Sequence, residues 1–215
     1  MLKQIAQNIP GCRAAVSACR RFQKKNQFRR QLKSRDQIKL VIGSAGIFEK
    51  EWIPSERYFL DLLKPADWQR YFNNNVIQAI LAEHVWEHLT LEQGLVAAKQ
   101  CFEYLRPGGY LRFAVPDGYH PDPDYIAHVK VGGTGPGSDD HKVLYTYETA
   151  QKLFRAAGFE VILLEYFDET GRFCSAPWDP ANGKIHRSKQ FDERNKVKAL
   201  SYTSLILDAH KPAMI

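Results

Sequence analysis

Apolar and polar positions along the chain predict strands that alternate with helices. Ile38 to Ile42 and Val76 to Leu81 are short runs rich in branched residues, which is typical of strands buried on both faces. The same reasoning predicts further strands at 110–115, 160–166 and 201–209 and a helix from Tyr147 to Ala157 that ends at Gly158. This alternation favours an α/β domain.

A helix following Thr90 has the clearest boundaries. Thr90 and Gln93 form a capping box, because the Thr hydroxyl can accept from an early helix N–H while Gln93 reaches back. Apolar residues spaced by three and four give the helix one apolar face: Leu91, Leu95, Ala98, Phe102 and Leu105. Pro107 and the Gly108-Gly109 pair are expected to end it in a turn. The flanking strands and this helix predict a right-handed parallel crossover.

Acidic and histidine side chains gather at the end of the 76–81 strand, in the segment AILAEHVWEHL. Ligands of open α/β sheets bind outside the carboxyl ends of the strands. Glu83, His84, Glu87 and His88 are therefore the first candidates for a site.

The segments EHVWEHL and LRPGGYLRFAVPD, followed by HKVLYTYETA, resemble the second half of class I S-adenosylmethionine-dependent methyltransferases. The chain is similar to a methyltransferase-like group that shares an EH-x-x-EHL segment, and the likeness extends over residues 38 to 211. It implies a Rossmann-like fold with a mostly parallel sheet, an antiparallel last strand and a reduced first helix. It also implies S-adenosylmethionine as cofactor and methyl transfer to an oxygen or nitrogen of a small or glycan-related acceptor.

Cofactor contacts are expected from the loop after the 38–42 strand. Gly43, Ser44 and Gly46 correspond to the glycine-rich loop of the resembled family, where glycine allows close backbone approach. The acid usual two positions before the first glycine is Val41 here. The remaining candidates are acids at the ends of strands, Glu56 and Asp61 for ribose hydroxyls and Glu83 beside cofactor and substrate.

A methyl acceptor must lose a proton, and His or carboxylate groups suit that step. The candidate catalytic residues are His84, Glu87, His88, Asp117 and His141, with His120 as a further possible base. The Pro- and Gly-rich stretch from 118 to 140 is expected to be a long loop that closes over the site. Basic residues between 184 and 198 are compatible with an anionic acceptor, and a solvated loop explains them equally well.

Three other interpretations of these residues remain open. His84 to His88 matches H-x-x-E-H, the signature of a zinc peptidase, but that motif needs a long helix. Glu87 and His88 could simply cap the next helix, and the fold could serve a non-catalytic binding or scaffold protein. No metal site is predicted from residue spacing.

Charge divides the 215-residue chain into a basic arm, residues 1–37, and an α/β domain, residues 38–215. Residues 1–39 carry a net charge of +10, whereas the rest carries −4. As a helix, the arm could rest on an anionic membrane surface or, as a minor option, on RNA, and a solvated helix or a homodimer contact explains it at least as well. No apolar run is long enough for a membrane helix, and no cysteine pattern indicates disulfides or a zinc ribbon, so a cytoplasmic location is expected.

Overall fold

The computed structural model describes residues 10–197 and 200–213, which belong to two separate compact units. The first unit ends at Asp36 and contains the helix α2 (Pro10–Lys33). This helix is predominantly polar, and Val16 and Phe22 leave 46% and 65% of their surface exposed. No helix in the described ranges is both long and apolar enough to cross a membrane.

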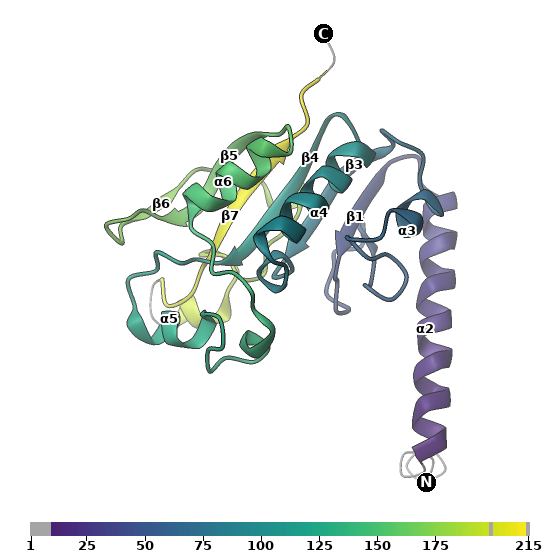
Figure 1. The fold of residues 1–215 in the computed structure, drawn as a ribbon, viewed down its shortest axis with the longest axis horizontal. Coiled ribbons are helices and arrows are strands. Elements are labelled where there is room, and N and C mark those ends of the chain that lie inside the picture. Colours follow the sequence, from purple (N-terminus) through teal and green to yellow (C-terminus); the bar gives the residue numbers. More distant parts are fainter. Residues whose placement is uncertain (1–9, 198–199, 214–215) are drawn as a thin grey trace. The chain divides into compact units, whose positions relative to one another are not determined.

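The second unit, from Gln37 onward, is built on one seven-stranded sheet of order β2-β1-β3-β4-β7-β5-β6 (Figure 1). Its strands are β1 (Ile38–Ile42), β2 (Ile53–Pro54), β3 (Ile77–Glu83), β4 (Leu105–Pro116), β5 (Glu160–Phe167), β6 (Phe173–Ser175) and β7 (Ser204–His210). Strands β1 to β4 are parallel, and β7 runs antiparallel between β4 and β5. The predicted fold class, a mostly parallel Rossmann-like sheet with an antiparallel last strand, is confirmed.

Helices α4 and α6 cover one face of the sheet (Figure 1). The helices of this unit are α3 (Pro65–Gln69), α4 (Leu91–Tyr104), α5 (Pro123–Val129) and α6 (Tyr147–Ala156), with short 3₁₀ turns η2 (Trp86–His88), η3 (Ser138–Asp140), η4 (Pro180–Asn182) and η5 (Glu193–Lys196). Phe113 of β4 is at the centre of this layer, where its ring packs edge-on against Trp86, Tyr145 and Phe154.

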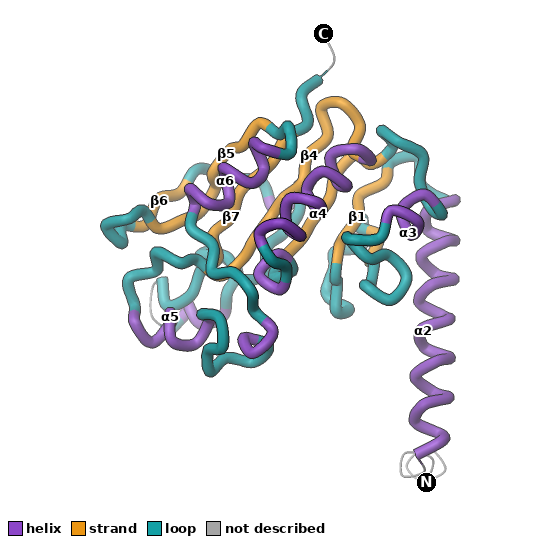
Figure 2. The backbone as a smooth tube through the Cα atoms, in the orientation of Figure 1, coloured by secondary structure: helices purple, strands orange, loops and turns teal. Residues whose placement is uncertain are grey.

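The opposite face is covered by loop rather than by a helix. Residues 43–52, between β1 and β2, contain no helix, so the predicted reduction of the first helix is confirmed. Ile185, Trp178 and Trp52 pack instead against the side chains that β1, β3, β4, β5 and β7 direct to this face. Figure 2 shows the segment after β6 as mostly loop. The segment between β6 and β7, called the C-terminal segment from here on, therefore closes this side of the hydrophobic core.

A buried ion pair holds this C-terminal segment in place. Arg112 is 2% exposed, and its Nε and Nη2 donate to the two carboxylate oxygens of Asp208, both at 2.8 Å. Its Nη1 donates to the carbonyls of Gly183 at 2.7 Å and Asp179 at 3.1 Å, and the guanidinium lies 5.0 Å from the Trp178 ring. The arginine thereby links two central strands to the loop that covers them.

The predicted start of α4 is confirmed, but its predicted end is wrong. Thr90 accepts from the Gln93 N–H at 3.3 Å, and the Gln93 side chain accepts from the Thr90 N–H at 3.1 Å. The helix ends at Tyr104, and the Pro-Gly-Gly segment lies inside β4 as an irregularity in its pairing with β3. A Cβ at Gly109 would lie 2.8 Å from the carbonyl oxygen of Gln78, so glycine is required by this close strand approach rather than by a helix stop.

The predicted loop from 118 to 140 contains more structure than its composition indicated. It holds α5 and η3. Asp122 caps α5 by accepting from the Asp124 N–H at 2.9 Å, and Pro123 follows at the first helical position. Tyr125 and Val129 then pack with Tyr202, so local capping and tertiary packing together order the segment.

Candidate functional site

A cavity of about 320 Å³ lies where β1 and β3 end. The chain passes from β1 outward to β2 and then returns to β3 on the other side of β1, so this is the point at which the strand order reverses. Open α/β sheets bind ligands at such points. Of the residues predicted from the sequence, the cavity wall includes Gly43, Asp61, His84 and His88.

The glycine-rich loop follows directly after β1, and its first residue, Gly43, lines this cavity. Gly43 has φ 61°, a left-handed conformation that favours glycine, and a Cβ there would lie 3.1 Å from Cγ2 of Val85 across the cavity. Ser44 donates its N–H to Ser55 at 3.0 Å and its hydroxyl to Oε1 of Glu56 at 3.2 Å. The fold thus brings Glu56, which follows β2, beside the loop. Ser44, Gly46 and Glu56 are not among the residues that line the cavity.

Asp61 lines the cavity from the segment that leads into α3. Its Oδ1 accepts from the N–H of Leu63 at 3.0 Å, while Oδ2 lies 3.6 Å from Nε of Arg57 and 3.7 Å from Nζ of Lys64. These contacts fix the carboxylate at the wall. Arg57, which the sequence analysis did not select, lies on the same wall and brings a cation to it.

His84 lies directly after β3, and its backbone leaves the strand sharply. Its φ is 55°, and its N–H donates to the carbonyl of Ala114 at 2.8 Å. Nδ1 of the ring is 3.1 Å from Oε1 of Glu87, and Nε2 is 3.1 Å from Oγ of Ser204. The ring also stacks on Tyr202, with the ring centroids 6.5 Å apart. Both ring nitrogens therefore have partners that fix the orientation of the imidazole.

The H-x-x-E-H segment does not form the helix that a zinc peptidase requires. A right-handed helix cannot include a residue with φ 55°, and only the three-residue 3₁₀ turn η2 follows His84. His84 and His88 therefore do not share one face of a long helix.

His141 lies close to Glu87 and His88 although it is far from them in the sequence. The carbonyl of Glu87 accepts from the N–H groups of Lys142 at 2.6 Å and Val143 at 3.3 Å, which joins η2 to the residues after η3. The rings of His88 and His141 lie edge to face, with centroids 4.9 Å apart. Four of the five residues predicted to be catalytic, His84, Glu87, His88 and His141, are thus neighbours.

Asp117 and Glu83 face other parts of the molecule. Asp117 is fully buried, and its carboxylate accepts from the N–H groups of Tyr119 at 2.9 Å and Phe167 at 2.7 Å. Burial raises the pKa of Asp117 to about 6, against the lowering effect of these two bonds. Glu83 points to the opposite face of the sheet, where it accepts from the N–H groups of His186 at 3.0 Å and Arg187 at 2.8 Å.

Several residues around the site carried no clear signal in the sequence. Asp140 lines the cavity, with Oδ2 at 3.5 Å from Nδ1 of His88, and a hydrogen bond from Lys142 lowers its pKa. The DDH run around it could have suggested this role. Tyr145 is buried, and both its burial and the charge of Glu87 raise the pKa of its hydroxyl.

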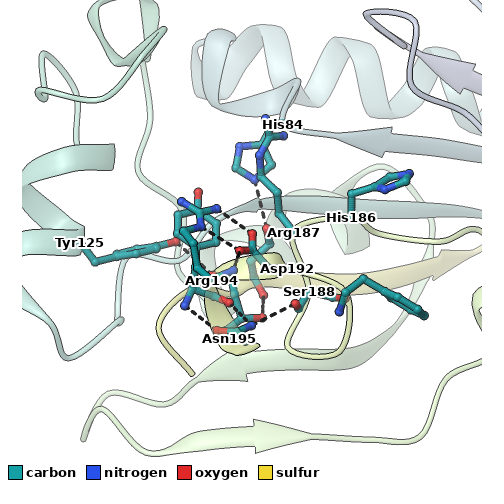
Figure 3. A network of polar contacts seen from close by, with 12 residues as sticks. His84, Tyr125, His186, Arg187, Ser188, Asp192, Arg194 and Asn195 are labelled. Atoms are coloured by element: carbon teal, nitrogen blue, oxygen red, sulfur yellow. Dashed lines mark hydrogen bonds and ion pairs between the residues drawn. The ribbon is translucent and has the colours of Figure 1, made fainter. Parts of the chain in front are cut away.

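The C-terminal segment forms the other side of the His84 environment (Figure 3). Arg194 donates to both oxygens of Asp192, at 2.8 and 2.7 Å, and its guanidinium lies 3.4 Å from the centre of the Tyr202 ring. Asn195 donates to the carbonyl of Tyr202 at 2.6 Å and accepts from its N–H at 2.9 Å. This network holds Tyr202 against His84.

Comparison of the sequence with protein-family models and with curated proteins finds no match. Comparison of the fold with solved structures finds similarity to an S-adenosylmethionine-dependent methyltransferase from Archaeoglobus fulgidus, with 13% identity, TM-score 0.46 and coverage of 89% of this chain and 94% of that chain. One from Thermotoga maritima has 13% identity, TM-score 0.48 and coverage of 93% and 97%. Phosphoethanolamine N-methyltransferase 2 of Haemonchus contortus has 11% identity and TM-score 0.46, with 89% of this chain matching 52% of that one.

The class of fold follows from the chain's own topology. The strand order, the antiparallel β7 between β4 and β5 and the cavity at the reversal of strand order define a Rossmann-like α/β domain.

Proposed function

We propose that the chain is an S-adenosylmethionine-dependent methyltransferase that acts on a small-molecule or glycan-related acceptor. The observation that carries this proposal is the cavity at the carboxyl ends of β1 and β3, which has Gly43 on its wall and His84 at the same edge. Its volume of about 320 Å³ is within the range of small-molecule sites, ~300–1,000 Å³.

The residues at the cavity fit S-adenosylmethionine. The bare Gly43 backbone lets a ligand approach where a side chain would meet Val85, and Asp61 offers carboxylate oxygens at the wall. Glu56, which Ser44 holds beside the loop, does not line the cavity, and its contact with the ribose hydroxyls stays a prediction. When bound, this cofactor supplies an electrophilic methyl group on a sulfonium sulfur.

His84 would receive the proton that the acceptor loses. With a proton on Nδ1 directed at Glu87, Nε2 carries the lone pair and Ser204 donates its hydroxyl to it. An acceptor hydroxyl or amine that replaces Ser204 at Nε2 can transfer its proton there. The buried Glu87 carboxylate then stabilises the imidazolium that forms.

An anionic acceptor is supported by the cationic side chains that the C-terminal segment brings toward His84. The side chains of Arg187 and Arg194 are 45% and 47% exposed, so their guanidinium groups are accessible as well as paired. Guanidinium groups suit the recognition of carboxylate and phosphate. Part of this charge is offset by Asp192 and Glu83.

The non-catalytic alternative is supported by one observation. Val41, which occupies the position of the usual acid, is 4% exposed and belongs to the hydrophobic core, so this position offers no polar group to a cofactor. A binding or scaffold protein that does not bind the cofactor would not need an acid at this position. The predicted cytoplasmic location, homodimer contact and anionic-surface contact of the arm also stay predictions.

Calorimetric titration of the full chain with S-adenosylhomocysteine tests the proposal. We expect micromolar binding that is lost in Gly43→Val, because the added side chain would strain the backbone and meet Val85. Gly108→Val is the matched control, since Gly108 also has a positive φ, 73°, but lies at the opposite end of β4 from the cavity. Absence of binding in the folded wild-type protein would favour the non-catalytic alternative.

A further inference from the structure

Three side chains that can ligate a metal ion meet beside the cavity. Glu87, His88 and His141 each offer one ligand atom, and these atoms lie within 4.8 Å of one another. Zinc bonds to His nitrogen and carboxylate oxygen are about 2.0–2.2 Å long, so adjustments of the side chains by about 1 Å would place an ion between them. The backbone bonds from Lys142 and Val143 to Glu87 hold the two segments in this arrangement.

The Glu87 carboxylate lacks the hydrogen bonds that a buried acid normally has. Glu87 is 1% exposed, and its Oε2 has no hydrogen-bond partner among the described residues. Its Oε1 lies 3.1 Å from Nδ1 of His84, and the other nitrogen of that ring, Nε2, lies 3.1 Å from Oγ of Ser204. An unsatisfied buried carboxylate is costly, and a bound cation would offset that cost.

The two histidines are prepared to act as ligands. Nδ1 of His141 lies 2.7 Å from the carbonyl oxygen of Val129, which can only accept, so Nδ1 carries the proton and Nε2 keeps its lone pair. Such a bond to a backbone carbonyl is the usual way in which a metal-binding imidazole is oriented. Nδ1 of His88 is buried without a hydrogen-bond partner among the described residues, and Asp140 is its nearest acid, at 3.5 Å.

We propose that Glu87, His88 and His141 bind one Zn²⁺ ion at the edge of the cavity. Two imidazoles and one carboxylate are a typical ligand set for zinc sites that keep a fourth position open. This set differs from the His84–His88 pair of the H-x-x-E-H motif, and it uses His141 from a distant segment. His88 lines the cavity, so an open position on this side of the ion would take an oxygen of the acceptor. Only this last role depends on the proposed methyltransferase function; metal binding does not.

The first experiment measures zinc directly in the full chain. Protein purified without a metal-affinity tag or chelator is examined by elemental analysis, and chelator-treated protein is then titrated with ZnCl₂ by calorimetry. We expect one equivalent of zinc per chain, with binding at least about tenfold weaker in Glu87→Gln and in His141→Ala. Tetrahedral Co²⁺ absorption in the visible range, lost in the same variants, would report the ligand set independently of zinc affinity.

His210→Ala is the matched control, because His210 ends β7 and packs on Tyr110 outside the cluster. The proposal is overturned if wild-type protein binds no zinc, or if both ligand variants bind it as tightly as His210→Ala. Glu87→Gln preserves the shape of the side chain, so this variant tests the zinc site by itself if His141→Ala does not fold. Titration of the same preparations with S-adenosylhomocysteine tests the methyltransferase proposal separately, since either ligand can bind without the other.

Discussion

Nδ1 of His84 lies 3.1 Å from Oε1 of Glu87, and this contact depends on a left-handed backbone at His84, with φ 55°. A non-glycine residue in this region is uncommon, and such strain is concentrated at functional sites. The turn points the imidazole back toward η2 and places its other nitrogen at Ser204. The end of β3 is thus shaped to present one histidine between two polar partners.

Replacement of His84 by Asn should separate the chemistry from the fold. Asn tolerates a left-handed backbone, so the turn should persist, whereas the proton acceptor is lost. We expect methyl transfer to fall by about 10²–10⁴-fold, with a much smaller change in the affinity for S-adenosylhomocysteine. Release of that product, from S-adenosylmethionine and a mixture of small acceptors with hydroxyl or amine groups, provides the measurement. Full activity in a folded His84→Asn variant would exclude the assigned role.

Replacement of Arg112 by Ala should be strongly destabilising. It would leave Asp208 buried without its partner and remove the bonds that hold the Gly183 loop, so we expect a loss of about 3–5 kcal/mol in the free energy of unfolding. Arg172→Ala is the control: the Arg172 side chain is 78% exposed and pairs with Asp168, and its loss should change the free energy of unfolding far less than the loss of Arg112. Urea unfolding of both variants checks the difference, and equal costs would contradict it.

Asp117 should give the protein a specific dependence on pH. Burial raises its folded pKa from 3.8 to about 6, so the folded state retains a proton that the unfolded state releases between these values. Its contribution to stability is fully present below pH about 4 and is lost as the pH rises through about 6. Relative to wild type, Asp117→Asn should therefore gain stability over this window, by up to about 1.4 kcal/mol per pH unit.

Urea unfolding at several pH values between 4 and 7 measures this effect of Asp117. Asp139→Asn, at an exposed position, is the control and should follow the wild-type curve. A constant difference between wild type and Asp117→Asn across the range would show that the folded pKa of Asp117 is not raised.

Replacement of Glu83 by Ala should loosen the C-terminal segment. Its carboxylate accepts from two consecutive backbone N–H groups, those of His186 and Arg187. We expect faster hydrogen exchange at these two amides, with little change in the affinity for S-adenosylhomocysteine, because Glu83 does not line the cavity. Glu49→Ala, which removes only partly exposed ion pairs to Lys184 and His186, should leave the exchange unchanged. Strongly reduced cofactor binding in Glu83→Ala would instead support the contact predicted from the sequence.

Local patterns in the sequence determined most of the secondary structure and the edge of the sheet at which the site lies. The apolar runs predicted β1, β3, β5 and β7, and the Thr90 capping box predicted the start of α4, because these features depend on residues close in the chain. The position of His84 and Glu87 just after a strand was likewise sufficient to place them at the carboxyl edge of the sheet.

The tertiary structure decided which of the candidate residues meet. The approach of His141 to Glu87 depends on backbone bonds between segments far apart in the chain, and no local pattern encodes them. Asp117 and Glu83 resemble site residues in the sequence, but their oxygens bind backbone N–H groups that only the folded core brings to them. The Pro107-Gly108-Gly109 segment signals a turn locally, yet it lies within β4, at the irregularity between the residues on either side that pair with β3. The sequence therefore determined the elements and the edge that carries the site, whereas long-range packing determined which polar groups remain available for chemistry.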